Sequence, residues 1–231
     1  MTPLQDLVFL LDVDNTLLDN DRVIADLRAH LQLEFGTASA ARYWAIFEAL
    51  RSELGYADYL GALQRYRLDA ELGQGNDLRL LQMSAFLIDS PFADRLYPCA
   101  LEVIESLNTF GPTVILSDGD VVFQPHKVRR SGLWSAVAGR VLIYIHKEQM
   151  LGAVQRHHPA RHYVMVDDKL RILTAMKAAM QGRLTTVFPR QGHYALDLAA
   201  NAAHPAADLS IDRIGDLLDA DIRSLFAPPE K

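Results

Sequence analysis

A short apolar run that ends in acids stands near the start of the chain and limits the folds that the chain can adopt. Residues 7–13 are apolar apart from one acid, and a second acid follows directly. A strand buried on both faces of a parallel sheet has this pattern, because helices cover both sides of such a sheet. Similar runs predict further strands at 113–116, 140–145, 163–166 and 184–188, with a weaker candidate at 207–211.

Segments with helical spacing separate most of these runs. Apolar residues recur every three to four positions in 100–107, 121–131, 148–157 and 170–180. Strands that alternate with helices form an open sheet with helices on both faces. The chain is therefore predicted to have a Rossmann-like α/β fold with a doubly wound parallel sheet.

The interval between the first two strands does not follow this alternation. Residues 20–92 contain repeated helical patterns and no convincing strand. Such a long helical stretch directly after the first strand predicts a separate subdomain inserted into the α/β unit. We therefore divide the chain into a core, residues 1–19 and 93–231, and an all-helical cap, residues 20–92.

Composition narrows the set of partners. Lys and Arg number 23 against 29 for Asp and Glu, which gives a formal net charge of −6. Because this charge repels phosphate at a distance, neither nucleic acid nor an anionic membrane is expected as a partner. With one cysteine, the chain has no intrachain disulfide and no cysteine-based zinc site. The first residues resemble neither a signal peptide nor a membrane span, so a cytoplasmic protein is expected.

Polar residues follow several of the predicted strands at their carboxyl ends, the edge at which ligands bind to an open α/β sheet. They are Asp12, Asp14 and Thr16 after the first strand, Ser117 and Asp118 after the second, Lys147 after the third, and Asp167 and Asp168 after the fourth. Four strand ends therefore deliver carboxylates, hydroxyls and an ammonium to one edge.

This set of groups suits the transfer of a phosphoryl group. One carboxylate of the pair Asp12 and Asp14 can attack phosphorus, and the other can donate and withdraw protons. The acid pair after the fourth strand supplies the hard oxygens that Mg²⁺ requires. Ser117 can donate a hydrogen bond to a phosphoryl oxygen, and Lys147 can balance charge in the transition state.

The same residues resemble the motifs of the haloacid dehalogenase (HAD) superfamily of hydrolases, most of whose members are magnesium-dependent phosphatases. The first motif, Asp-x-Asp-x-Thr, matches residues 12–16, the second matches Ser117, the third Lys147, and the fourth the acid pair 167–168. The resemblance covers almost the whole chain, and it implies that the helical insertion is a C1-type cap.

The resemblance also implies a role for each residue. Asp12 would be the nucleophile and Asp14 the general acid/base, with Lys147 as the catalytic lysine. The implied metal ligands are Asp12, Asp14 through its main-chain carbonyl, Asp167 and Asp168, the last of these directly or through water. The implied phosphate contacts are Asn15 through its backbone N–H, Thr16, Ser117, Asp118 and Lys147.

Two positions depart from the motifs or compete with them. Asp118 stands where relatives commonly have Asn, and it adds negative charge near the phosphate. Lys127 is a second candidate for the lysine of the third motif. Lys147 is favoured because it follows an apolar run and opens the next helical segment.

The resulting hypothesis is a magnesium-dependent phosphomonoester hydrolase that acts on a small phosphorylated metabolite through an aspartyl-phosphate intermediate. A 2-haloacid dehalogenase of the same superfamily is an alternative, although such members work without Mg²⁺ and usually lack the acid at Asp14. A phospho-receiver is another alternative, but it would place its acids on different strands and lack the insertion. A non-catalytic binding protein would not need the intact set of motifs.

Overall fold

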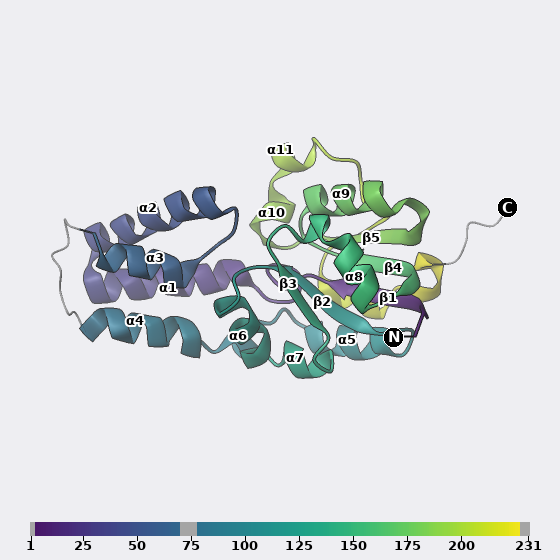
Figure 1. Ribbon diagram of the computed structural model, residues 1–231, viewed down its shortest axis with the longest axis horizontal. Coiled ribbons are helices and arrows are strands. Elements are labelled where there is room, and N and C mark those ends of the chain that lie inside the picture. Colours follow the sequence, from purple (N-terminus) through teal and green to yellow (C-terminus); the bar gives the residue numbers. More distant parts are fainter. Residues whose placement is uncertain (1–2, 70–77, 227–231) are drawn as a thin grey trace.

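A six-stranded parallel sheet forms the centre of the structure, a computed structural model that describes residues 3–69 and 78–226. The strand order is β3-β2-β1-β4-β5-β6, and helices lie on both sides of the sheet (Figure 1). The strands are β1 (Gln5–Leu11), β2 (Thr113–Asp118), β3 (Val141–Tyr144), β4 (Ala160–Val166), β5 (Leu184–Pro189) and β6 (Leu209–Ile211). The predicted doubly wound α/β fold is confirmed, with each expected strand within three residues of its expected bounds.

Helices connect these strands. They are α5 (Ala100–Asn108), α6 (Phe123–Arg130), α7 (Leu133–Ala136), α8 (Leu151–His157), α9 (Leu170–Met180), α10 (Gly192–Leu196) and α11 (Leu198–Asn201). Single 3₁₀ turns accompany them, namely η2 (Phe92–Arg95), η3 (Lys147–Gln149), η4 (Gln181–Arg183), η5 (Ile214–Leu218) and η6 (Ile222–Leu225). The single helix expected over 148–157 is divided into η3 and α8.

Strand β1 occupies an inner position because both of its faces are apolar. Leu7 and Phe9 belong to the hydrophobic cluster that contains α5, whereas Val8 and Leu10 belong to the cluster that contains α8 and α9. Alternation with a period of two sends neighbouring side chains to opposite faces. Burial of each such side chain contributes roughly 1.5–3 kcal/mol, so β1 is firmly anchored between the two layers.

The direction of winding changes beside β1. From β1 the chain moves outward to β2 and β3, and it then returns to β4 on the other side of β1. A crevice opens between the carboxyl ends of two strands at such a change of direction. Here these strands are β1 and β4, and residues 12–16 and 167–168 follow them directly.

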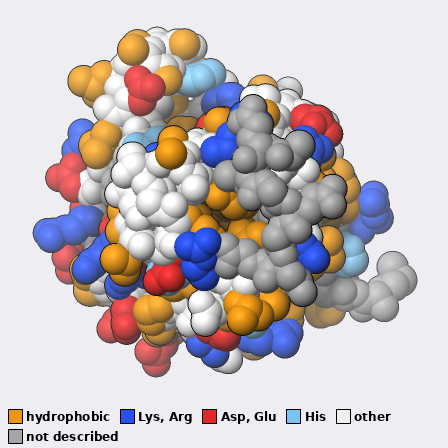
Figure 2. All heavy atoms as spheres, turned by 90° about the vertical axis from the view of Figure 1, so that its left-hand side faces the viewer, with side chains coloured by type: hydrophobic (Ala, Val, Ile, Leu, Met, Phe, Trp, Pro, Cys, Tyr) orange, Lys and Arg blue, Asp and Glu red, His pale blue; other side chains and the backbone are white. Residues whose placement is uncertain are grey.

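Four helices occupy the segment between β1 and η2. They are α1 (Asn20–Phe35), α2 (Thr37–Leu54), α3 (Tyr59–Arg67) and α4 (Leu78–Asp89), and the described residues of this segment form no strand. Figure 1 shows the four helices grouped at one end of the molecule, and Figure 2 shows that end, where hydrophobic side chains and charges of both signs are interspersed. The division at residues 20 and 92 stays a prediction.

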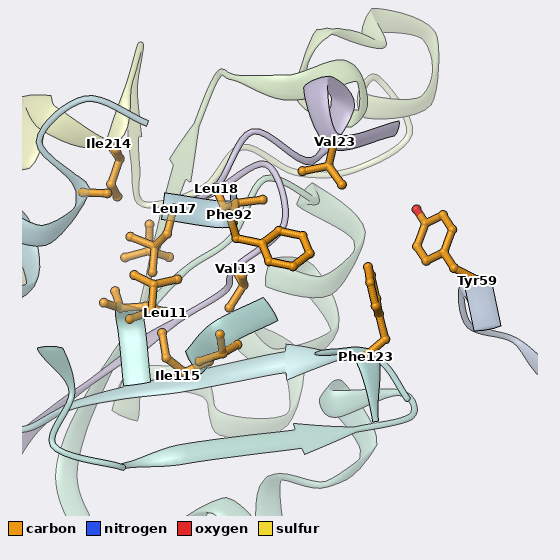
Figure 3. Packing of buried hydrophobic residues seen from close by; sticks show 14 of the residues in the cluster. Leu11, Val13, Leu17, Leu18, Val23, Tyr59, Phe92, Ile115, Phe123 and Ile214 are labelled. Atoms are coloured by element: carbon orange, nitrogen blue, oxygen red, sulfur yellow. The ribbon is translucent and has the colours of Figure 1, made fainter. Parts of the chain in front are cut away.

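An aromatic contact joins this insertion to the core. Tyr59 at the start of α3 packs on Phe123 at the start of α6, with 5.3 Å between ring centroids, and Phe123 meets Phe92 at 5.8 Å. Figure 3 shows Tyr59 beside Phe123 near the ends of the strands. None of the helices within residues 3–69 and 78–226 has both the length and the apolarity that a membrane crossing requires.

Candidate active site

The backbone places two of the predicted acids at the crevice beside β1. The N–H of Asp12 donates to the Val166 carbonyl at 3.0 Å, and the N–H of Asp167 donates to the Val187 carbonyl at 3.2 Å. The hydrogen bonding of the sheet therefore continues one residue beyond β1 and β4. Both acids are fixed at their main chain by the most buried part of the fold.

Lys147 brings an ammonium group to these acids. It is the first residue of η3, its side chain is 1% exposed, and Nζ pairs with Oδ1 of Asp12 and lies 2.7 Å from Oδ2 of Asp167. Burial alone would lower the pKa of Lys147, but the carboxylates of Asp12, Asp167 and Asp118 raise it above its usual value. Lys147 is therefore a fixed positive charge, and the structure brings it, rather than Lys127, to Asp12.

Three acids beside Lys147 form a potential cation site. Asp12, Asp167 and Asp168 are buried, and each offers a carboxylate oxygen within 4.8 Å of the others. Among the described residues, neither carboxylate oxygen of Asp168 has a hydrogen-bond partner. Burial raises the pKa of Asp167 to about 6 and that of Asp168 well above its usual value. Because buried and unpaired carboxylates are costly, these residues fit a bound cation, and their oxygens are the ligands that Mg²⁺ prefers.

Thr16 and Asn15 shape the loop after β1. The Thr16 hydroxyl donates to Oδ2 of Asp12 at 3.4 Å and accepts the N–H of Asp168 at 3.1 Å. The N–H of Asn15, which we expected at the phosphate, donates instead to the Leu18 carbonyl at 2.7 Å. Asn15 has a positive φ of 62°, which turns the loop back on itself and uses this N–H internally. Its contact with phosphate stays a prediction.

The end of β2 contributes Ser117 and Asp118. The Ser117 hydroxyl is buried and accepts a hydrogen bond from Nε2 of Gln124 at 3.0 Å. Oδ1 of Asp118 accepts the backbone N–H of Lys147 at 2.7 Å, and burial raises the pKa of Asp118 despite the nearby ammonium. Asp118 thus holds the backbone from which Lys147 projects, and its contact with phosphate stays a prediction.

Two residues of α6 complete the site: Lys127, which the sequence offered only as the less favoured catalytic lysine, and Gln124, which it did not indicate. Nζ of Lys127 lies 2.6 Å from Oδ1 of Asp14, and Nε2 of Gln124 lies 3.3 Å from Oδ2 of the same carboxylate. Their spacing of three residues predicts that they share one helix face. Nothing in that spacing predicts which part of the chain the face meets.

A cavity of about 750 Å³ lies between the core and the insertion. Its core side includes Asp14, Asp118, Lys127 and Lys169, and its other side is formed by residues of α1, α2 and the start of α3. The side chain of Asp14 is 26% exposed, whereas that of Asp12 is 3% exposed. Asp14 is therefore open to a ligand in the cavity, and Asp12 lies deeper.

Comparison with known proteins shows the family of this chain. The haloacid dehalogenase-like hydrolase family matches residues 7–179, and the chain belongs to that family. It is an HAD-like hydrolase, hence an enzyme. A crystal structure named as a haloacid dehalogenase-like hydrolase, from Burkholderia xenovorans LB400, is 67% identical, covers 94% of this chain and 99% of its own, and has a TM-score of 0.87.

More distant structures share the fold. An HAD hydrolase of Bacillus subtilis, bound to magnesium, is 19% identical with a TM-score of 0.61, over 93% of this chain and 98% of its own. The L-2-haloacid dehalogenase of Xanthobacter autotrophicus is 18% identical with a TM-score of 0.57, over 91% and 96%. No curated protein gives a significant match. At such identities these structures show a common fold alone, so the chemistry must be argued from the residues of this chain.

Proposed function

We propose that this hydrolase is a magnesium-dependent phosphatase that cleaves the phosphomonoester of a small metabolite through an aspartyl-phosphate on Asp12. The observation that carries the proposal is the buried cluster of Asp12, Asp167 and Asp168, whose oxygens lie within 4.8 Å of one another. One ammonium group, that of Lys147, pairs with two of these acids. The carboxylate of the third, Asp168, has no hydrogen-bond partner among the described residues, and a divalent cation would coordinate its buried oxygens.

The charges around the site favour the same conclusion. The acids are Asp12, Asp14, Asp118, Asp167 and Asp168, and the bases are Lys127, Lys147 and Lys169. When all are ionised, two negative charges remain. One Mg²⁺ ion would balance them before an anionic substrate enters, which removes the repulsion that an acidic site otherwise offers to phosphate.

In the first half of the reaction, the buried Asp12 bonds to phosphorus and the more exposed Asp14 transfers the proton. Mg²⁺ held by Asp12, Asp167 and Asp168 would neutralise phosphate charge beside the nucleophile. A carboxylate oxygen of Asp12 forms a bond to phosphorus while the bond from phosphorus to the leaving oxygen breaks, and Asp14 gives that oxygen a proton. Lys147, beside Asp12, stabilises the negative charge throughout.

The second half of the reaction regenerates the enzyme. A water molecule attacks the phosphorus of the aspartyl-phosphate, and Asp14, now a carboxylate, takes a proton from that water. The bond from Asp12 to phosphorus breaks, and inorganic phosphate leaves. Asp14 is suited to both halves because its side chain is open to the cavity.

A 2-haloacid dehalogenase is the second candidate, since solved structures of this fold include such enzymes. In that reaction Asp12 would displace a halide from carbon, which requires neither a metal nor a proton donor for the leaving group. Asp14 and the acid cluster around Asp168 would then have no use. The phosphatase is preferred for that reason.

A two-substrate assay separates these candidates. Purified protein is given p-nitrophenyl phosphate or 2-chloropropionate, each with Mg²⁺ and after removal of metal with EDTA. We expect phosphate release that needs Mg²⁺, and no chloride release. Chloride release in EDTA without phosphate release would replace the phosphatase with the dehalogenase.

The proposed substrate is a small phosphorylated metabolite, and neither nucleic acid nor a membrane is proposed as a partner. A cavity of about 750 Å³ is within the usual range of small-molecule sites. The helices of the insertion form one side of it, which disfavours a polymer as substrate. A panel of phosphorylated metabolites at fixed Mg²⁺ would identify the substrate. The cytoplasmic location stays a prediction.

A further inference from the structure

A buried lysine that the proposed steps do not use lies next to Asp14. The side chain of Lys127 is 1% exposed, and its Nζ lies 2.6 Å from Oδ1 of Asp14 and 3.1 Å from Oδ1 of Asn20. Lysine is almost never buried this completely unless it is paired, because the ammonium loses its hydration. Among the described residues, Asp14 is the one acid within ion-pair distance of Lys127.

Gln124 holds the other oxygen of the same carboxylate. Its Nε2 lies 3.3 Å from Oδ2 of Asp14 and 3.0 Å from Oγ of Ser117. Gln124 is itself confined, because it is 3% exposed and packs closely on Gly119. A Cβ added to Gly119 would lie only 2.6 Å from the Cβ of Gln124. Helix α6 therefore holds both carboxylate oxygens of Asp14 through two side chains on one face.

This arrangement matters because a proton donor works only within hydrogen-bond reach of its acceptor. Asp14 lies in the loop after β1, and its side chain is 26% exposed to the cavity. A carboxylate at a cavity wall has several rotamers of similar energy, most of which would direct it away from a leaving group. Two fixed partners reduce that freedom before substrate binds.

We propose that Lys127 is a positioning residue that, together with Gln124, holds Asp14 in the orientation from which it protonates the leaving oxygen. The inference rests on the proposed phosphatase function, in which Asp14 is the general acid. Lys127 does not contact the reacting atoms. Lys127 acts through the Asp14 carboxylate. Its loss should therefore slow only those reactions in which the leaving group needs the proton of Asp14.

The leaving group provides the test. A p-nitrophenolate leaves without protonation, whereas the alkoxide of β-glycerol phosphate needs a proton as it leaves. We compare kcat/KM, which reports the steps up to transfer of the phosphoryl group to Asp12, for Lys127→Met and Lys127→Arg. Lys127→Met should lose about 100-fold on β-glycerol phosphate and less than about 5-fold on p-nitrophenyl phosphate. Lys127→Arg, which keeps the charge, should recover part of the loss.

The matched control is Lys177→Met, which removes a lysine that pairs with Asp208 and the Leu184 carbonyl instead. It should leave both kcat/KM values within about 3-fold of the wild type. Equal losses on both substrates in Lys127→Met would show a merely structural role and overturn the proposal.

A readout without substrate complements the kinetics. Crystal structures of the variants should show the Asp14 carboxylate displaced from Gln124 in Lys127→Met and in place in Lys127→Arg and Lys177→Met. An unmoved carboxylate in Lys127→Met would overturn the inference.

Asp14→Asn separates this inference from the function on which it rests. If Asp14→Asn lowers kcat/KM selectively on β-glycerol phosphate and Lys127→Met does not, only the proposed role of Lys127 fails. If the wild type hydrolyses no phosphomonoester, the proposed function fails and the role of Lys127 fails with it.

Discussion

Two lysine–carboxylate pairs involve acids that follow β1, and they differ in what surrounds them. Lys147 pairs with Asp12 and Asp167, and the carboxylate of a further acid beside them, Asp168, has no hydrogen-bond partner in the part of the chain that the structure describes. Within residues 3–69 and 78–226, Asp14 is the one acid that pairs with Lys127, and Gln124 also contacts that carboxylate. The first region carries an excess of negative charge, whereas the second is balanced.

The difference suits the two regions to two roles, binding of a cation in the first and orientation of a carboxylate in the second. Excess buried charge is costly, so the region around Lys147 fits the divalent cation that we propose for it. The balanced pair around Lys127 needs no further group and fixes an orientation instead. The five predictions that follow test this contrast, from the largest expected effect to the smallest.

Asp12→Asn should abolish hydrolysis while leaving the fold intact. We expect kcat on p-nitrophenyl phosphate to fall by at least about 10⁴-fold, because an amide does not attack phosphorus. The free energy of unfolding without metal should not fall, since the change removes charge from the overloaded region. The control is Asp6→Asn, an exposed acid on the opposite end of β1, which should match the wild type in kinetic assays and urea unfolding.

Lys147→Met should destabilise the protein far more than Lys127→Met. It leaves Asp12, Asp167 and Asp168 buried without their ammonium, and breaking such a contact costs about 3–5 kcal/mol. Lys127→Met leaves a partly exposed Asp14, which water can hydrate. Urea unfolding in EDTA measures both losses, and equal losses would show that the two regions do not differ in charge balance.

In the absence of metal, Asp168→Asn should raise the free energy of unfolding, whereas Lys147→Met should lower it. Because burial raises the pKa of Asp168 well above its usual value, its ionised form opposes folding near neutral pH. The metal-free variant should therefore be more stable than the wild type near neutral pH. Added Mg²⁺ should stabilise the wild type strongly and the variant weakly, as thermal unfolding would show.

The pH dependence of this difference follows from the raised pKa values. The pKa of Asp167 is raised from 3.8 to about 6, so the folded protein retains protons that the unfolded chain has lost. These acids therefore make the metal-free protein less stable as pH rises from about 4 to about 6. The pKa of Asp168 is also raised, so the advantage of Asp168→Asn over the wild type should grow as pH rises above about 4, the usual carboxyl range. A difference that does not change with pH would contradict the assignment.

Asp118→Ala should have the smallest effect. It removes the acceptor for the Lys147 N–H, and loss of one such hydrogen bond lowers kcat by roughly 10-fold. Asp118→Asn keeps an acceptor at that position and should lose less than about 3-fold. A larger loss in Asp118→Asn would show that the charge itself, and not the hydrogen bond, is required.

The sheet and the main acids could be predicted because local patterns determine them. Each strand is a short apolar run, and the rule for the carboxyl ends of parallel strands brings Asp12, Asp167 and Lys147 together without knowledge of packing. Its place after a strand distinguishes Lys147 from Lys127, and the structure agrees with that choice of partner for Asp12.

The other contacts depend on packing that no local pattern encodes. Helix α6 presents Lys127 and Gln124 to Asp14 because Phe123, at its start, is packed between Phe92 and Tyr59 of the insertion. The internal use of the Asn15 N–H could not be predicted either, because it depends on a positive φ that is a property of the folded loop.

Strand β1, paired on both sides and covered on both faces, also determines how the enzyme would lose activity. Its amide hydrogens, and that of Asp12, are held by β2 and β4 and should exchange with solvent only when the whole molecule opens. Asp12, the proposed nucleophile, directly follows this segment, so we expect its backbone to become disordered only when the whole molecule unfolds. Heat inactivation and global unfolding should therefore occur at the same temperature.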